Sequence, residues 1–162
     1  MQPKGTRLIW ILPLMGFMAM AQGDQSLNSE RAIVATIQQI ERSQGPYASE
    51  LVDRLTSLGA LYYRKRQYTL AIDTYRRAQE VLHRHEGVYA MAQLDLVDWL
   101  ALNYLMVGDV AAADTQQQFR YQVLLHNYDE MDVRLLPTLN RLGDWYYALG
   151  QLWDSEYFYE QA

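Results

Sequence analysis

The stretch Leu55–Ala78, LTSLGALYYRKRQYTLAIDTYRRA, decides the fold because two similar stretches follow it in the same chain. The second, Val97–Arg120, reads VDWLALNYLMVGDVAAADTQQQFR, and the third, Leu139–Ala162, reads LNRLGDWYYALGQLWDSEYFYEQA. The three stretches begin 42 residues apart, and each carries a tyrosine at its eighth position. Several matched positions at one fixed offset indicate an internal repeat, so the chain is organised as a series of similar units.

Each copy combines two apolar stripes of helical spacing with a short turn between them. The turns are Arg66-Gln67, Gly108-Asp109 and Gly150-Gln151, and glycine suits the left-handed conformation at the end of a helix. Small residues recur on both helices, which lets the two helices of a pair approach closely; they are Gly59, Ala101 and Gly143 on the first helix and Ala71, Ala113 and Ser155 on the second. The sequence therefore predicts an all-α fold of antiparallel helix pairs that stack to bury their remaining apolar faces.

This pattern resembles the tetratricopeptide repeat. The resemblance is carried by Leu55-x-x-Leu58-Gly59-x-x-Tyr62 with Ala71, Tyr75 and Ala78 downstream, and the third copy is nearly as good a match. The second copy departs from the family pattern at Gln117 and Arg120, where the family favours an aromatic residue and an alanine. The usual unit has roughly 34 residues, so the 42-residue period is similar to the longer variant found in kinesin light chains and many bacterial proteins. The resemblance implies a right-handed α-solenoid, with three helix pairs over residues 51–162.

The N-terminus has the features of a secretory signal peptide. Lys4 and Arg7 precede an apolar run from Leu8 to Met18, and Ala19-Met20-Ala21 follows as a small-x-small site. We expect cleavage after Ala21 and a periplasmic or secreted protein, with an uncleaved N-terminal anchor as the alternative. Residues 22–26 are predicted to be loose. Residues 27–50 are predicted to form a capping helix and a loop, because Ile33, Ile37 and Ile40 lie on one helical stripe.

Composition excludes several classes of function. Half of the residues are apolar and 13 are tyrosine, so a packed core is expected, and the absence of cysteine excludes disulfides and thiol catalysis. Without Lys4 and Arg7 the chain has 12 basic and 19 acidic residues, a net charge of −7, which argues against nucleic acid as a partner. We find no catalytic motif and expect no enzyme activity, no cofactor and no metal: His83 and His85 are two residues apart and face different sides of a helix. The carboxylates of Asp129–Asp132 are interpreted as a solvated loop, since the central glycine of a calcium loop is missing.

Charge is also divided along the chain. Residues 62–85 have a net charge of +4, and residues 86–132 have a net charge of −7. This polarity either steers a partner or favours head-to-tail contact between copies. The alternative is that the charges simply form solvated helix faces.

The resemblance also implies where a partner binds, because tetratricopeptide stacks hold an extended peptide in the groove lined by the first helix of each pair. The corresponding positions are Asp53, Thr56, Ala60, Tyr63, Arg64, Asp95, Asp98, Leu102, Leu105, Met106, Asn140, Asp144, Tyr147 and Ala148. Among them we predict Tyr63, Arg64, Asp98, Asp144 and Tyr147 as the partner-binding residues. Thr56 and Ala60 stand where the carboxylate clamp of chaperone-binding members begins, so that specificity is not expected. The groove suits a peptide with apolar and basic character, and the alternative is that several of these residues, Leu102 and Leu105 above all, only pack.

The last predicted helix is rich in aromatic residues. A solenoid is expected to end in a polar outer helix, whereas this one carries Trp153, Tyr157 and Phe158. This pattern predicts either a continuation in a longer protein or self-association through these three side chains. We therefore expect an exported, non-catalytic scaffold that binds a protein or peptide in the cell envelope; the alternative is an accessory segment of a larger enzyme or assembly machine.

Overall fold

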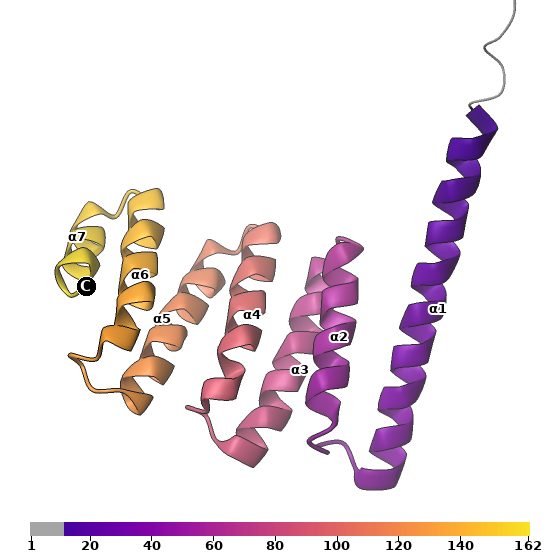
Figure 1. Cartoon of the computed structure of the whole chain (residues 1–162), viewed down its shortest axis with the longest axis horizontal. Helices are drawn as coiled ribbons and strands as arrows, with labels where there is room; N and C mark the ends of the chain where they lie inside the picture. The colour runs from indigo at the N-terminus through magenta and orange to yellow at the C-terminus, as the bar shows by residue number, and fades with distance from the viewer. Residues whose placement is uncertain (1–11) are drawn as a thin grey trace, which may run out of the picture.

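The fold is all-α, as predicted. The computed structural model describes the backbone of residues 12–162 and the side chains from residue 27 onward, and within this part of the chain it contains helices and no strand. The helices stand side by side in one row (Figure 1); they are α1 (Leu12–Gln44), α2 (Leu51–Arg64), α3 (Tyr68–Glu86), α4 (Leu94–Met106), α5 (Val110–Asn127), α6 (Leu136–Ala148) and α7 (Leu152–Glu160). Single 3₁₀ turns, Met91–Gln93 and Val133–Leu135, lead into α4 and α6.

The three repeated stretches fold as helix pairs α2–α3, α4–α5 and α6–α7, each closed by the same tight turn. Arg66, Gly108 and Gly150 occupy the left-handed region, with φ of 59°, 81° and 74°. The next residue in each turn donates its backbone N–H to the tyrosine carbonyl five residues earlier, at 2.9 Å in all three turns. The predicted turns are confirmed, and Arg66 adopts without a glycine the conformation that glycine supplies in the other two.

Small residues hold the helices of a pair close together. A Cβ added to Gly59 would lie 2.7 Å from the ring of Tyr75, and one added to Gly143 would lie 2.5 Å from the ring of Tyr159. In the middle pair Ala101 stands in place of the glycine and is 1% exposed. Its partner position holds Gln117, also buried, where the other pairs have a tyrosine ring. The middle pair therefore departs from the repeat pattern at both of these positions: Ala101 replaces the glycine, and Gln117 replaces the tyrosine that the glycine accommodates in the other pairs.

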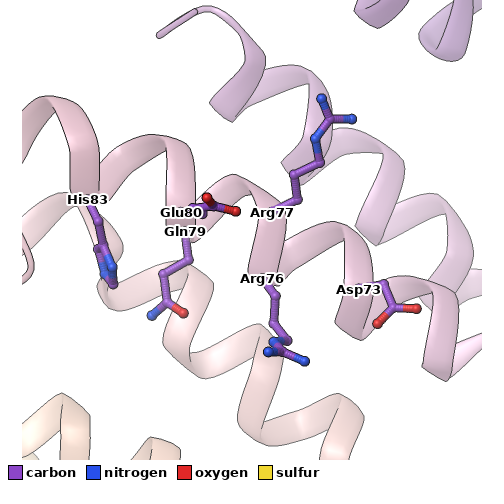
Figure 2. Close-up of a pocket in the computed structure, with 6 residues that line it drawn as sticks. All are labelled: Asp73, Arg76, Arg77, Gln79, Glu80 and His83. Atoms are coloured by element: carbon purple, nitrogen blue, oxygen red, sulfur yellow. The ribbon is translucent and has the colours of Figure 1, made fainter. Parts of the chain in front are cut away.

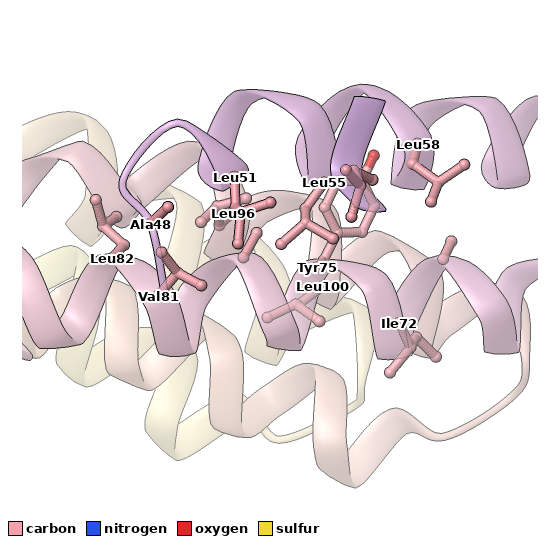
Figure 3. Close-up of a cluster of buried hydrophobic side chains, with 13 residues drawn as sticks. Ala48, Leu51, Leu55, Leu58, Ile72, Tyr75, Val81, Leu82, Leu96 and Leu100 are labelled. Carbon is pink, nitrogen blue, oxygen red and sulfur yellow. The ribbon is translucent and has the colours of Figure 1, made fainter. Parts of the chain in front are cut away.

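Each helix packs against the next one along the chain, and alternate helices belong to the same layer, so there are two layers. In the first-helix layer, α2, α4 and α6, Tyr63 contacts Trp99 and Asp98 pairs with Arg141. The second-helix layer holds α1, α3, α5 and α7, joined by the Glu41–Arg77 ion pair and by the contacts of Phe119 with His83 and of Phe158 with Tyr121. The main core lies where α1, α2, α3 and α4 meet (Figure 3) and is built from buried residues such as Leu51, Leu55, Ile72, Tyr75 and Leu100.

Helix α1 occupies the place of a second helix that precedes α2. Ile37 is buried in the core, and Ile33 and Ile40 pack against it. The backbone of residues 22–26, predicted to be loose, is part of α1; no proline occurs between Pro13 and Pro46 to interrupt a helix there. Residues 1–11 of the predicted signal peptide lie outside the described residues. Within the described residues, no helix combines the length and apolar character that a membrane crossing requires.

Candidate partner-binding site

A pocket of about 350 Å³ opens between α4 and α6 in the first-helix layer. Four side chains of α4 line it, at the spacing i, i+3, i+4 and i+7 that keeps residues on one helix face, and one side chain comes from α6; they are Asp95, Asp98, Trp99, Leu102 and Arg141. Three of the five, Asp95, Asp98 and Leu102, belong to the predicted groove positions. The pocket thus combines an apolar floor with three charged groups.

Asp98 is engaged within the protein. One carboxylate oxygen accepts a hydrogen bond from Arg120 Nη1 at 2.9 Å, and the other lies 3.0 Å from Arg141 Nη2 as an ion pair. Its side chain remains 33% exposed, and a partly exposed pair of this kind contributes only about 1 kcal/mol or less to stability. Asp98, one of the predicted partner-binding residues, therefore lines the pocket, and its charge is already shared by two arginines from α5 and α6.

Asp95, at the edge of the pocket, is exposed and forms no ion pair or side-chain hydrogen bond with another described residue. It follows that Asp95 presents a full negative charge to a bound molecule, beside side chains whose charges are compensated.

Trp99 forms the floor of the pocket and is fixed by other aromatic rings. Its indole stacks on Tyr75 with ring centroids 5.7 Å apart and is in T-shaped contact with the ring of Tyr63, with centroids 5.4 Å apart. Neither Trp99 nor Arg141 was among the predicted groove residues, and the two hold equivalent positions one repeat apart. Ser57 holds the same position in the first copy, so the repeat pattern carries no common signal there. The signal available was the position of Trp99 on the same helix face as Asp95 and Leu102.

The other predicted binding residues lie apart from this pocket. Tyr63 is half-buried against Trp99 and Tyr68, so it packs on the indole of Trp99 and does not line the pocket. Arg64 is exposed at the end of α2, and Tyr147 is 66% exposed on α6. Asp144 is exposed and accepts a hydrogen bond from the hydroxyl of Tyr159 at 2.6 Å, which raises the pKa of that hydroxyl.

The aromatic residues of α7 divide into two groups. Trp153 is 85% exposed and Tyr157 is 55% exposed. Phe158, which was predicted to be part of the same surface, is half-buried and stacks on Tyr146 with ring centroids 5.4 Å apart. Phe158 thus contributes to packing within the pair, and the exposed aromatic surface consists of Trp153 and Tyr157.

A second cavity, of about 430 Å³, lies along α3 in the other layer (Figure 2) and is lined by Asp73, Arg76, Arg77, Gln79, Glu80 and His83. All six side chains come from one helix and all are polar. Arg77 points away from Arg76 and is paired with Glu41 of α1. Because no other element supplies a wall, this cavity offers a ligand little enclosure.

His83, His85 and Asp132, of the acidic loop, each form contacts within the protein. His83 Nε2 lies 2.6 Å from the side-chain oxygen of Gln93, and His85 Nε2 lies 2.5 Å from the carbonyl of Tyr47. Hydrogen bonds from the side chain and backbone of Arg134 lower the pKa of Asp132 to about 2. In the described part of the chain, no three histidine or carboxylate side chains are placed to share a metal ion.

Comparison with known proteins supports the helix-pair architecture. No protein-family model and no curated protein matches the sequence. Among solved structures, the chain is similar to BtubC (BKLC) from P. vanneervenii, with a TM-score of 0.70 and 16% sequence identity. The match covers 85% of this chain and 55% of BtubC, so the chain spans about half the length of that neighbour. At this identity the likeness shows the fold alone.

Proposed function

We propose that the chain is a right-handed α-solenoid of the tetratricopeptide kind, and that it acts as a non-catalytic scaffold binding a protein or peptide partner in the cell envelope. The observation that carries this proposal is the pocket between α4 and α6. It combines Trp99 and Leu102 with the unpaired carboxylate of Asp95 on the face formed by the first helices. A few polar groups around an apolar floor are typical of ligand sites.

Preorganisation favours binding at this pocket. Trp99 is held by Tyr75 and Tyr63, and the α6 wall is tied to α4 by the ion pair of Asp98 with Arg141. A partner therefore loses little affinity to the ordering of side chains on the scaffold. The predicted groove residues of α6 are exposed and extend the surface along that helix; they are Asn140, Asp144, Tyr147 and Ala148.

Selection from a displayed random peptide library, with the full chain as bait, tests this function. We expect selected peptides to lose at least about tenfold in affinity for Leu102→Arg, because the long side chain fills the pocket. Leu70→Arg is the control in the other layer: Leu70, on α3, is 47% exposed, whereas Leu102 is half-buried. Thermal unfolding monitored by circular dichroism establishes that both variants fold. Selected peptides that bind Leu102→Arg as tightly as the unchanged chain would overturn the proposed site.

Export is a separate part of the proposal and rests on the basic and apolar N-terminus. Expression of the full chain in a Gram-negative host, followed by fractionation and mass measurement, tests it. We expect a periplasmic product that begins at Gln22. A product that retains Met1 in the cytoplasmic fraction would contradict export and leave the binding proposal to be judged by the peptide selection.

A second candidate function is favoured by the exposed aromatic residues of α7. Trp153 and Tyr157 form an apolar surface that suits docking into a larger enzyme or assembly machine, or contact with another copy. Sedimentation of the full chain and of a Trp153→Ser, Tyr157→Ser variant separates the uses of this surface. Self-association that is lost in the variant supports contact between copies, and a monomer in both cases leaves the docking role.

A further inference from the structure

We propose that the pocket between α4 and α6 receives a positively charged side chain of the partner, an arginine or a lysine; this proposal rests on the proposed function. The uncompensated charge around the pocket, the chemistry of its floor and the position of the unpaired carboxylate lead to the same class of ligand.

The charge of the surrounding half of the molecule is strongly negative. Residues 86–162 contain twelve acidic residues and three arginines, a net charge of −9, whereas residues 22–85 contain seven acidic and nine basic residues. All three arginines of the acidic half are already paired: Arg120 and Arg141 with Asp98, and Arg134 with Asp132. A cation approaching the pocket therefore gains attraction from carboxylates that form no ion pair with a described residue, and an anion is repelled.

The pocket floor suits the shape of such a side chain. Trp99 and Leu102 provide an apolar surface for the methylene stem of arginine or lysine. One face of the Trp99 indole is stacked on Tyr75, and where the ring borders the pocket a guanidinium or ammonium group also gains the cation–π attraction, which is strongest for tryptophan. Arginine packs in this way against two tyrosines of the described part of the chain: Arg84 lies 3.6 Å from the ring centre of Tyr47, and Arg134 lies 3.7 Å from that of Tyr128.

The charged side chains on the two sides of the pocket, Arg141 on α6 and Asp95 on α4, orient the head group of the ligand. Arg141 on the α6 wall repels a second cation, while its own charge is balanced by Asp98 at 3.0 Å. Asp95 on α4 accepts a charge-assisted hydrogen bond from the ligand, because none of its oxygens is used by a described residue. The ligand head group is thus drawn toward Asp95, across the face of Trp99.

Nuclear magnetic resonance of the full chain tests this specificity without a known partner. The probe is N-acetyl-argininamide, titrated while the indole N–H resonance of Trp99 is followed; comparison with Trp99→Phe assigns that resonance. The neutral control is N-acetyl-citrullinamide, which keeps the shape of arginine and removes its charge. We expect a saturable shift with the arginine probe and a shift at least about fivefold smaller with citrulline.

Two variants locate the effect. Asp95→Asn should weaken binding of the arginine probe at least about fivefold, because it removes the free carboxylate. Asp73→Asn is the matched control: Asp73 is exposed on α3, in the other layer, and forms no ion pair with a described residue, so its loss should leave the titration unchanged. Equal shifts with arginine and citrulline, or an unchanged titration in Asp95→Asn, would overturn the proposal.

The peptide selection distinguishes this inference from the function on which it rests. Selected peptides that lose affinity for Leu102→Arg and also lose it when their basic residue becomes glutamine support both. Selected peptides that need the pocket and contain no basic residue support the scaffold function and overturn the cationic ligand. Peptides indifferent to Leu102→Arg overturn both.

Discussion

The first and last helix pairs contain the same close contact in different surroundings. In α2–α3 the glycine is Gly59 and the ring is Tyr75, and in α6–α7 they are Gly143 and Tyr159. Tyr75 is fully buried under Trp99 of α4, whereas Tyr159 is 43% exposed. The helix that follows a pair, and not the pair itself, therefore decides how tightly the aromatic ring is held.

The largest expected difference comes from adding a methyl group to the two glycines. Gly59→Ala places a Cβ 2.7 Å from a ring that cannot move, so we expect a loss of about 2 kcal/mol, after the gain of alanine in helix propensity. In Gly143→Ala the exposed ring of Tyr159 is free to swing away, and we expect a change near zero. Urea unfolding of both variants measures the difference. Equal losses would show that the following helix does not hold the ring.

The two turns allow a reciprocal exchange with effects of about 1 kcal/mol. Arg66→Gly should stabilise the protein, because a residue with a Cβ is strained at φ 59°. Gly150→Arg should destabilise it by a similar amount at φ 74°, through the backbone alone, since no atom lies within 4 Å of an added Cβ. Thermal unfolding of the two single variants and of the double variant checks both signs. A stabilising Gly150→Arg would contradict this account.

Removal of the two tyrosine hydroxyls should give effects of opposite sign. The hydroxyl of Tyr75 is buried without a hydrogen-bond partner among the described residues, so Tyr75→Phe should raise stability by up to about 1 kcal/mol. Tyr159→Phe loses an exposed hydrogen bond to Asp144 and should cost about 0.5 kcal/mol or less. Urea unfolding at pH 7 compares the two variants.

Tyr75→Phe should also change the stability of the protein at alkaline pH. Burial raises the pKa of Tyr75 above its ordinary value of 10.0, so its contribution to stability is complete below about pH 10 and is lost as the pH rises above that value. Tyr75→Phe should therefore unfold at a higher pH than the unchanged chain in a titration followed by circular dichroism. An identical alkaline midpoint would argue that Tyr75 ionises freely in the folded protein.

A further small effect is expected at the small residues of the second helices. Ser155 donates a buried hydrogen bond to the carbonyl of Gly143 at 2.9 Å, while Ala71 holds the equivalent position in the first pair. Ser155→Ala should cost about 0.5–1 kcal/mol, and Ala71→Ser should be nearly neutral if its hydroxyl finds the carbonyl of Gly59. Differential unfolding of the two variants measures this exchange. A loss above about 2 kcal/mol for Ala71→Ser would show that the first pair has no room for an oxygen atom.

Much of the fold was predictable because the repeat becomes visible when the chain is aligned with itself at an offset of 42 residues. The turns at Gly108 and Gly150 and the small residues at Gly59 and Ala71 follow from local geometry that every pair repeats. The candidate site was less predictable because it depends on contacts between repeats. Tyr63 packs on Trp99 of the next pair, and Arg141 reaches Asp98 from the pair after, so neither contact appears in a single copy. Phe158 packs on Tyr121 of the preceding pair as well as on Tyr146 of its own pair, and the contact with Tyr121 is likewise not visible in a single copy.

The packing of each helix on the next along the chain also bears on how the protein reaches its native state. The extensive contacts join consecutive helices, so the sequence separation between contacting residues is small compared with the length of the chain. Low contact order is associated with folding times of microseconds to milliseconds and with transition states built from local structure. We therefore expect the first pair together with α4, which encloses the ring of Tyr75, to serve as the nucleus, and order to propagate from there toward the C-terminus.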